Sequence, residues 1–384
     1  MRDTTNLLTA IRHQTRELSP LDASFAGQTM VLTGATGGIC GRTARLLAEH
    51  GAATLVLGVR NLAKGERVAA ELRRGLDPPP EVLLWPLDLA SFASVRAFAA
   101  RVAALPRLDV VMLGAGVMTN DTVVTEDGWE QTLEVIHLSC ALLSVLVAPT
   151  LARSAAQRGT TGVLANVSSF AAFMARSAMR LPGARAQAKA RPKPALLRSL
   201  DRVRPLLQQQ QYMRAKLAHL VFLRALARRL AAPRLVDVHS VDPGICVTDL
   251  SQIHWFSRLM GRLGVYRPLE ACARAVAHAC VPAPGTNGAV MRDYEPIPYP
   301  KFMDSPKGKE WERLLWEETG LVLGRLAPEA KTIWEDMEAG KLLSAPGGEG
   351  DTEEMVMDGA AVVSGVRVEA ASTPEGKEEF VVMG

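Results

Sequence analysis

The chain has 384 residues, of which 48% are apolar and 22% charged, a composition typical of a globular protein with one large core. No apolar run reaches the roughly 18–20 residues of a membrane span, and the N-terminus has no apolar signal core, so we expect a cytoplasmic protein that is not secreted. The five cysteines lack CxxC spacing, which predicts single thiols in a reducing compartment and argues against disulfides or a zinc site.

Short apolar runs alternate with amphipathic stretches through the first 250 residues. Alternating strands and helices favour βαβ units, and strands that are apolar at nearly every position indicate a parallel sheet covered on both faces. We therefore predict an α/β fold, a single-domain, doubly wound parallel sheet of the Rossmann type. Strands are expected at 29–33, 54–58, 82–87, 110–114, 163–167 and 236–241, and helices at 42–50, 63–74, 94–105, 129–147 and 216–230.

The domain is expected to span residues 26–330, after an N-terminal extension at 1–25. Residues 174–211, which hold several prolines and end in QQQQ, are predicted to be an insertion. Residues 296–320 suggest an irregular segment followed by a short amphipathic helix. Residues 345–384, rich in Gly, Glu, Ser and Thr, are predicted to be a disordered acidic tail.

Charge is unevenly spread along the chain. From Ser344 onward there are nine acidic and two basic residues, a net charge of −7. Because the whole chain has a formal net charge of +4, the part before Ser344 carries about +11. Between residues 176 and 204 there are nine Lys or Arg and one acidic residue. Such a run can bind nucleic acid or an anionic membrane, or it can be a solvated loop. We favour the loop, because no aromatic residues are interleaved to stack on bases.

A glycine-rich turn, TGATGGICG at residues 33–41, separates the first strand from the first helix. Backbone N–H groups and the positive end of the helix would point at a pyrophosphate there. Gly34 allows the turn, and Gly38 lets the backbone approach the ligand, since a Cβ would intrude. Cys40 stands where a glycine normally permits close packing of helix on strand, which we expect to widen this contact without closing the site. Alone, the motif also fits an ordinary tight turn.

The second strand ends in VLGVRN, where an NAD site needs an acidic residue for the ribose 2′-hydroxyl. Arg60 offers a guanidinium to a 2′-phosphate instead, which favours NADP over NAD. The alternative is a solvated arginine after a strand. Asp88, after the third strand, could accept a hydrogen bond from the adenine amino group or cap a helix that begins near Ser91.

Tyr212 and Lys216, in YMRAK, share one face of a helix, and Ser168 and Ser169 end the fifth strand in NVSS. A lysine ammonium, helped by the positive ring of a nicotinamide, would lower the phenol pKa toward neutrality. The phenol could then exchange a proton with a substrate oxygen held by a serine hydroxyl, while hydride moves at the carbon. A Tyr-x-x-x-Lys pair by itself also fits a contact on a helix surface. The serine pair and the glycine-rich turn strengthen the catalytic interpretation.

Together these motifs resemble the short-chain dehydrogenase/reductase (SDR) family from about residue 29 to 250, with a weaker similarity to about residue 320. TGATGGIC resembles the family's TGxxxGxG, and RNLAKGE the arginine-containing segment of its NADP-preferring, retinol-dehydrogenase-like branch. NVSS, YMRAK and VDPG resemble the catalytic strand, the catalytic helix and the loop beside the nicotinamide. The insertion and the segment through LLWEETG are similar to fungal members, several of which serve secondary-metabolite pathways.

The resemblance implies a role for each matching residue. Tyr212 is the implied acid/base and Lys216 its partner and ribose contact. Ser169, preferred over Ser168 as the second serine of the pair, holds the substrate oxygen. A dimer or tetramer is also implied, and no metal. The implied NADP(H)-binding residues are Gly34, Thr36, Gly38, Ile39, Arg60, Asp88, Gly116, Tyr212, Lys216, Pro243, Gly244 and Thr248.

Besides Cys40, three positions depart from the family pattern. Leu113 and Gly114 replace both asparagines of NNAG, so a hydrogen-bonding support under the cofactor is missing. Ile136 stands where the family has the asparagine that holds a water in its proton relay. An isoleucine side chain cannot bind that water, so proton delivery to Tyr212 would need another route.

The sequence therefore predicts an NADP(H)-dependent oxidoreductase that interconverts a carbonyl and an alcohol on an apolar small molecule, with reduction favoured because NADP pools are kept reduced. Trp255, Phe256 and Met260 are candidates to line its pocket, or equally to pack in the core. The alternative is a non-catalytic NADP-binding regulatory or scaffold protein, suggested by the missing asparagine and the altered turn. Nucleic-acid binding through the basic run is disfavoured.

Overall fold

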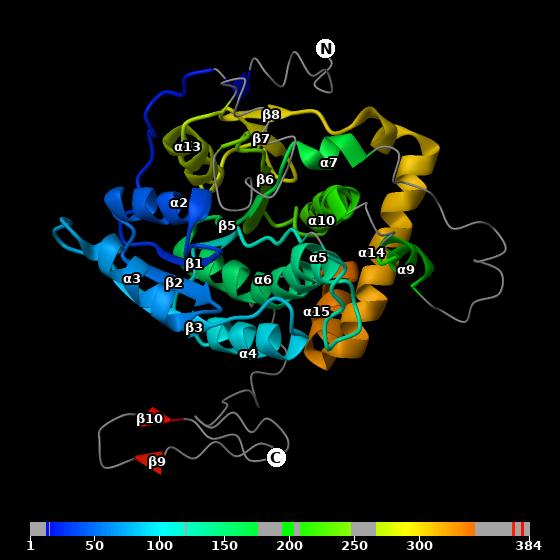
Figure 1. Cartoon of the computed structure of the whole chain (residues 1–384), viewed down its shortest axis with the longest axis horizontal. Helices are drawn as coiled ribbons and strands as arrows, with labels where there is room; N and C mark the ends of the chain where they lie inside the picture. The colour runs from blue at the N-terminus through cyan, green and yellow to red at the C-terminus, as the bar shows by residue number, and fades with distance from the viewer. Residues whose placement is uncertain are drawn as a thin grey trace. The chain divides into compact units, whose positions relative to one another are not determined.

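A computed structural model of the chain describes residues 13–14, 16–119, 121–175, 194–202, 208–246, 266–341, 371–372 and 378–379. Its centre is an eight-stranded sheet in the order β3-β2-β1-β4-β5-β6-β7-β8 (Figure 1). All neighbours are parallel except β7 and β8, which form an antiparallel hairpin. The strands are β1 (Thr29–Thr33), β2 (Thr54–Val59), β3 (Glu81–Pro86), β4 (Val110–Leu113), β5 (Gly162–Val167), β6 (Val236–Val241), β7 (Val290–Arg292) and β8 (Glu295–Ile297).

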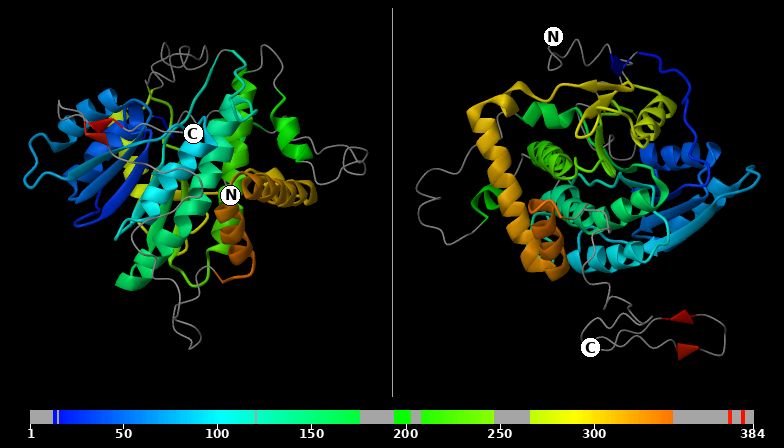
Figure 2. Two further views of the ribbon diagram at one scale, coloured as in Figure 1. Left: turned by 90° about the horizontal axis from the view of Figure 1, so that it is seen from below. Right: turned by 180° about the vertical axis from the view of Figure 1, so that it is seen from behind.

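Helices cover both faces of the sheet (Figure 2). One face carries α2 (Gly38–Glu49), α3 (Leu62–Arg73) and α13 (Leu269–Ala279). The other carries α4 (Phe92–Ala103), α6 (Ser139–Arg158) and α10 (Gln208–Arg229), with α14 (Pro306–Leu326) and α15 (Pro328–Glu338) packed against α10 and α6. Shorter helical segments are α5 (Gln131–Leu133), the π-helical turn η1 (Glu134–Leu138), α7 (Ala171–Met174), α9 (Ala195–Leu200) and the 3-10 turn η3 (Lys301–Asp304).

The central strands are apolar on both faces because each face meets a helical layer. In β1, Val31 points into the layer of α4, α6 and α10, while Met30 and Leu32 point into that of α2 and α13. Successive side chains of a strand alternate between faces, so a strand buried on both faces must be apolar at every position. The predicted doubly wound parallel sheet is confirmed, and all six predicted strands lie within one or two residues of the observed bounds.

The part of the chain after residue 207 departs most from the sequence-based expectation. The QQQQ run does not end an insertion loop but begins helix α10. The short helix expected within 296–320 is the 21-residue α14, and a second helix, α15, follows it. The short strands β7 and β8 and the alanine-rich α13 were not predicted. Hairpins of three-residue strands carry little periodic signal, so only tertiary packing reveals them.

The stretch Gln131–Arg158 is long and apolar enough to cross a membrane, with a mean hydropathy of 2.0 over its most apolar window. Such a stretch was not expected from the sequence, because polar residues interrupt the apolar runs within it. In the fold 94% of that window is buried. Its apolarity is explained by its place as the core helix between the sheet and α15.

The chain divides into two compact units, Met1–Ser344 and Ala345–Gly384. Within the first, part of the expected N-terminal extension packs into the core: Leu18, Leu21 and Phe25 are buried on the α2 and α13 face. Within the second, the described residues form the two-residue antiparallel pair β9 (Ala371–Ser372) and β10 (Glu378–Glu379). The rest of the expected acidic tail lies outside the described residues, as does most of 174–211.

Candidate functional site

A cavity of about 640 Å³ lies where β1, β4, β5 and β6 end at their carboxyl edge. In open α/β sheets this edge is the usual place for a ligand. Thr248 and the candidate wall residues Trp255, Phe256 and Met260 lie outside the described residues. The other candidate site residues all line the cavity: Gly34, Thr36, Gly38, Ile39, Arg60, Asp88, Gly116, Ser169, Tyr212, Lys216, Pro243 and Gly244.

The glycine-rich turn is held close to the end of β4. Thr33 Oγ1 accepts hydrogen bonds from Gly114 N at 3.0 Å and Ala115 N at 3.2 Å. Gly34 has φ +75°, and a Cβ there would meet Ala115 N at 2.7 Å. Only glycine combines this conformation with such a close approach. Helix α2 begins at Gly38, so its N-terminus and the free N–H groups of its first turn point into the cavity.

Two departures from the family pattern compensate each other. The Cys40 side chain occupies the space beside residue 114, where its thiol donates to Gly114 O over 3.4 Å. A Cβ at position 114 would lie 2.3 Å from Cys40 Sγ and 2.9 Å from Thr33 O. Cysteine in the turn therefore requires glycine at the end of β4. Cys40 was expected only to widen a contact. Instead its side chain takes up the volume that a side chain at position 114 would need, an exchange of volume between α2 and the end of β4.

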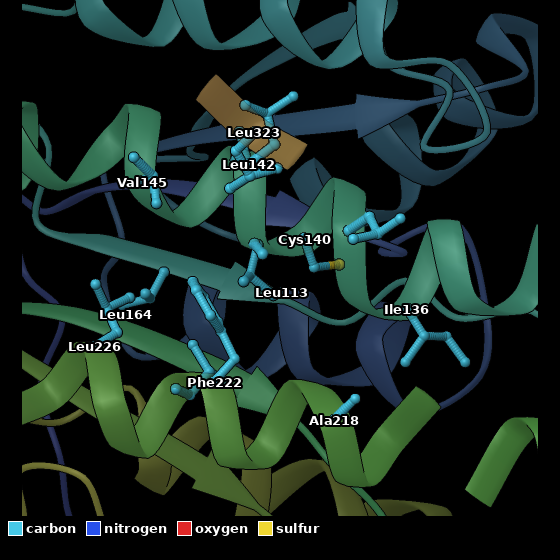
Figure 3. Packing of buried hydrophobic residues seen from close by; sticks show 14 of the residues in the cluster. Leu113, Ile136, Cys140, Leu142, Val145, Leu164, Ala218, Phe222, Leu226 and Leu323 are labelled. Carbon is cyan, nitrogen blue, oxygen red and sulfur yellow. The ribbon is translucent and has the colours of Figure 1, made fainter. Parts of the chain in front are cut away.

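The other two departures, Leu113 and Ile136, are core residues. Each is 1% exposed, and both belong to the apolar cluster between the sheet and α10 (Figure 3). Neither lines the cavity. Ile136 lies in the π-helical turn η1 beside Cys140, whose thiol donates to Val135 O. Apolar packing has taken the place of the polar groups that the family pattern has at these two positions.

A cationic pair lies at the far end of the cavity from β5. Arg60 follows β2, and Lys64 is one turn further on in α3; both side chains are exposed and both residues line the cavity. A Cβ on Gly37 would lie 3.7 Å from Lys64 Nζ, so this ammonium reaches the glycine-rich turn. Asn61 caps α3 by accepting from Lys64 N at 2.8 Å. Lys64 was not among the predicted site residues, although its spacing of four from Arg60 in RNLAK could have indicated it.

Asp88 does not cap a helix. Its Oδ1 accepts from Ala90 N at 2.9 Å, and helix α4 begins at Phe92 with Ser91 as its N-cap. The carboxylate is half-buried at the wall of the cavity. The alternative of an N-cap near Ser91 is therefore wrong for Asp88, which remains free to meet a ligand in the cavity.

Ser169 and Tyr212 meet at the opposite end of the cavity. Their side chains share a hydrogen bond, although they are 43 residues apart and come from the end of β5 and from α10. Ser168 also lines the cavity, but its Oγ is buried and has no hydrogen-bond partner among the described residues. Gln211 fixes the start of α10, because its Nε2 donates to Glu130 Oε2 at 2.9 Å.

The pKa of Tyr212 is raised in the chain alone, while a lowered pKa beside a bound nicotinamide stays a prediction. Burial raises the pKa of the phenol to about 12; the hydrogen bond with Ser169 lowers it and the charge of Asp242 raises it further. The ammonium of Lys216 lies 5.8 Å from the ring centroid of Tyr212. In the chain alone, desolvation is the largest influence on this pKa, and the phenol keeps its proton through the neutral pH range.

Lys216 is buried beneath the cavity. Its Nζ donates to Val167 O at 2.7 Å, which joins α10 to the end of β5. A Cβ on Gly116 would come within 3.8 Å of the same ammonium. Burial lowers the pKa of Lys216, because the charged form loses its hydration.

The loop Pro243–Cys246 closes one side of the cavity. Gly244 has φ +90°, and a Cβ there would meet Gln14 Oε1 at 2.9 Å. The same Oε1 accepts from Ile245 N at 2.9 Å. The segment before residue 26 therefore supports this loop, which no local pattern in the sequence had indicated.

The wall between Ser169 and the mouth of the cavity is mostly apolar. One polar side chain, Gln131, is among the residues that form it on the side of η1 and α10: Val117, Met118, Gln131, Val135, Phe170, Ala171, Met174 and Met213. A wall of this kind suits a hydrophobic organic molecule.

A larger groove, of about 1120 Å³, runs between α10, α14 and α15 and contains none of the candidate site residues. It is floored by Trp316 and Trp334, whose ring centroids are 3.9 Å apart, with the Arg229 guanidinium 3.8 Å from the Trp316 centroid. Its acids and bases largely pair with each other, as Glu312 does with Arg224 and Arg228. The chemistry of the site therefore belongs to the smaller cavity.

Comparison with known proteins agrees with this geometry. Residues 28–184 match the family model described as short chain dehydrogenase. The short chain dehydrogenase resG of Aspergillus sclerotiorum is 33% identical over 299 residues, which cover 77% of this chain and 83% of that protein. The crystal structure of a putative uncharacterized protein from Mycobacterium paratuberculosis is 26% identical, with a TM-score of 0.55, and covers 78% of this chain and 94% of that one. A 3-ketoacyl-(acyl-carrier-protein) reductase from Brucella melitensis, complexed with NADH, is 23% identical with a TM-score of 0.51 over 70% of this chain and 97% of that one, which shows a shared fold.

The exchange of volume between Cys40 and Gly114 predicts energetic coupling. Gly114→Ala should lower the free energy of unfolding strongly, because the new Cβ meets Cys40 Sγ. In a Cys40→Gly background the same change should cost less, by about 1–2 kcal/mol, the size of coupling usual for residues in contact. Recovery should be partial, since Thr33 O remains near the new Cβ. Urea denaturation of both single variants and the double variant measures this coupling; strictly additive losses would contradict the compensation.

Proposed function

The chain belongs to the short-chain dehydrogenase family, and on that premise we propose that it is an NADP(H)-dependent oxidoreductase that interconverts a carbonyl and an alcohol on an apolar small molecule. One observation carries the proposal: Ser169, Tyr212 and Lys216 converge at one end of a cavity whose other end holds a glycine-rich turn, a helix N-terminus and two cations. Membership of the retinol-dehydrogenase-like branch and a place in fungal secondary metabolism stay predictions that rest on motif resemblance.

The cavity fits a dinucleotide in its chemistry as well as its size. Its volume lies within the roughly 300–1,000 Å³ usual for small-molecule and cofactor sites. The turn at Gly34 admits no Cβ, and the first turn of α2 leaves N–H groups for a pyrophosphate. Pro243 and Gly244 would hold the nicotinamide end beside Tyr212, and the buried ammonium of Lys216 would meet the adjacent ribose.

Arg60 and Lys64 support NADP(H) as the preferred cofactor form. A 2′-phosphate carries close to two negative charges and accepts charge-assisted hydrogen bonds from both cations. NAD would need a carboxylate acceptor at this place for the ribose 2′-hydroxyl. Asn61, the N-cap of α3, leaves the second cation at the start of a helix, where the helix dipole also favours an anion.

In this mechanism the protein holds the substrate oxygen and supplies its proton. When bound, the reduced nicotinamide supplies the hydride that adds to the carbonyl carbon. Ser169 donates a hydrogen bond to the carbonyl oxygen, and the neutral phenol of Tyr212 transfers its proton to that oxygen as the carbon is reduced. Carbonyl reduction is the favoured direction, because NADP pools are kept reduced, and the neutral phenol of Tyr212 suits it to donate a proton in that direction.

A protonated Tyr212 predicts how its removal acts. Tyr212→Phe removes the donated proton while preserving the ring, so kcat for carbonyl reduction should fall by about 10²–10⁴-fold with NADPH affinity nearly unchanged. Tyr299→Phe is the matched control: this tyrosine is also half-buried, but its hydroxyl donates to Gly288 O, away from the cavity. NADPH oxidation over a panel of ketones, aldehydes and quinones measures both. Tight NADPH binding by the wild type without turnover on any of them would instead favour the non-catalytic, NADP-binding alternative.

The cationic pair predicts the choice between the two cofactors. Arg60→Ala and Lys64→Ala should each raise KM for NADPH about 10–100-fold, the worth of one hydrogen bond to a charged group, and leave KM for NADH nearly unchanged. Arg67→Ala is a suitable control, since Arg67 is an exposed cation of the same helix that does not line the cavity. Equal effects on the two cofactors would exclude a 2′-phosphate contact.

A further inference from the structure

A buried ion pair lies directly behind the meeting point of Ser169 and Tyr212. Asp242 follows β6 and is 3% exposed; Arg292 ends β7 and is also 3% exposed. Arg292 donates from Nε at 3.0 Å and from Nη2 at 2.7 Å to the same oxygen, Asp242 Oδ2. The pair is surrounded by the fold and has no access to a ligand of its own.

The second carboxylate oxygen of Asp242 connects the two loops that face the cavity. Oδ1 accepts from Phe170 N at 3.1 Å and from Gly244 N at 3.2 Å. Phe170 directly follows Ser169, and Gly244 is the turn residue of the loop Pro243–Cys246. One carboxylate group thus sets the distance between the serine and that loop.

Both sides of this arrangement are fixed against movement. The Arg292 guanidinium lies 5.6 Å from the ring centroid of Phe170 and 5.8 Å from that of Phe173. The next residue, Asp293, pairs with buried Arg267, which also donates to Pro243 O at 3.2 Å. The loop is therefore held by ionic contacts on two sides, and nothing in the chemistry described so far requires charges there.

We propose that Asp242 is a positioning residue, which through its hydrogen bonds to Phe170 and Gly244 holds Ser169 and the Pro243–Cys246 loop in register with each other, while Arg292 orients its carboxylate. This inference rests on the proposed function, because the spacing of Ser169 and the loop affects catalysis only if the cavity binds NADPH and a carbonyl substrate. A neutral amide could not replace the carboxylate, because its one acceptor oxygen cannot serve both the guanidinium and the two N–H groups.

The charge of Asp242 also affects the groups around it. The titratable and charged groups that interact with it are Tyr212 from α10, Cys272 from α13 and Arg292 from β7. Its negative charge raises the pKa of Tyr212. Loss of this charge should lower the phenol pKa, an effect that a merely structural residue would not have.

The experiment compares Asp242→Asn with Asp237→Asn. Asp237 lies on β6, the strand that Asp242 follows. It is fully buried, pairs with Arg234 and does not line the cavity, so its variant reports the general cost of breaking a buried ion pair. In Asp242→Asn we expect the Kd for NADPH, followed by protein fluorescence, to rise about tenfold. We expect kcat/KM for carbonyl reduction to fall about 100-fold, as for a displacement of about 1 Å. Asp237→Asn should keep wild-type values of both.

A pH profile separates positioning from stability. Alcohol oxidation needs the phenolate of Tyr212, so its rate rises with pH through the phenol pKa. Asp242→Asn lowers that pKa, and the rising limb should move to lower pH, whereas in Asp237→Asn it should stay in place. The proposal would be overturned if the two variants had the same Kd for NADPH, the same kcat/KM and the same pH for the rising limb of alcohol oxidation.

Two further outcomes keep the inference testable. If Asp242→Asn does not fold, Arg292→Lys takes its place: it keeps the cation but not the pair of hydrogen bonds to Oδ2, and should weaken NADPH binding and lower kcat/KM by smaller factors. Wild-type values in Arg292→Lys would refute the positioning role. If the wild type shows no turnover at all, the proposed function fails. A Kd for NADPH that is higher in Asp242→Asn but not in Asp237→Asn would still support the contact between Asp242 and the loop.

Discussion

The hydrogen bond from Lys216 Nζ to Val167 O is the contact on which the site depends. It fastens helix α10 to the end of β5, and this junction brings the phenol of Tyr212 against Ser169. The lysine is buried, so an unpaired ammonium there would be costly, and the carbonyl at the strand end compensates for lost hydration. Through this one contact, α10 and the end of β5 together place Tyr212, the proposed proton donor, at the cavity.

The departures from the family pattern follow from packing. Cys40 fills space that glycine leaves free at position 114. The glycine missing from the turn at position 40 is therefore matched by a glycine in place of a larger side chain after β4. Leu113 and Ile136 are absorbed into the core between the sheet and α10. The result is a cavity with its glycine-rich turn, cations and tyrosine in place, but with apolar groups where the family pattern expects asparagines. A route for protons that does not depend on Ile136 is consistent with a cavity open to solvent.

Local patterns predicted much of this molecule from the sequence, and contacts between distant segments account for the rest. Strand β1, the turn at Gly34 and the spacing of Tyr212 and Lys216 are encoded within a few residues, and so could be read directly. Asp242 and Arg292 are 50 residues apart and meet only because β7 is placed beside β6. The direction of the Tyr212 pKa shift could not be predicted, since it depends on how deeply the assembled fold buries the phenol.

We propose that the cavity binds a reduced nicotinamide with one face toward the carbon of a carbonyl held by Ser169 and Tyr212. The most direct test uses NADPH carrying deuterium on one and then on the other face of nicotinamide C4, with mass spectrometry of the alcohol product. Transfer of one deuterium to the carbinol carbon from a single face is the predicted result. An alcohol product with no label from either face, or with equal label from both, would contradict the account.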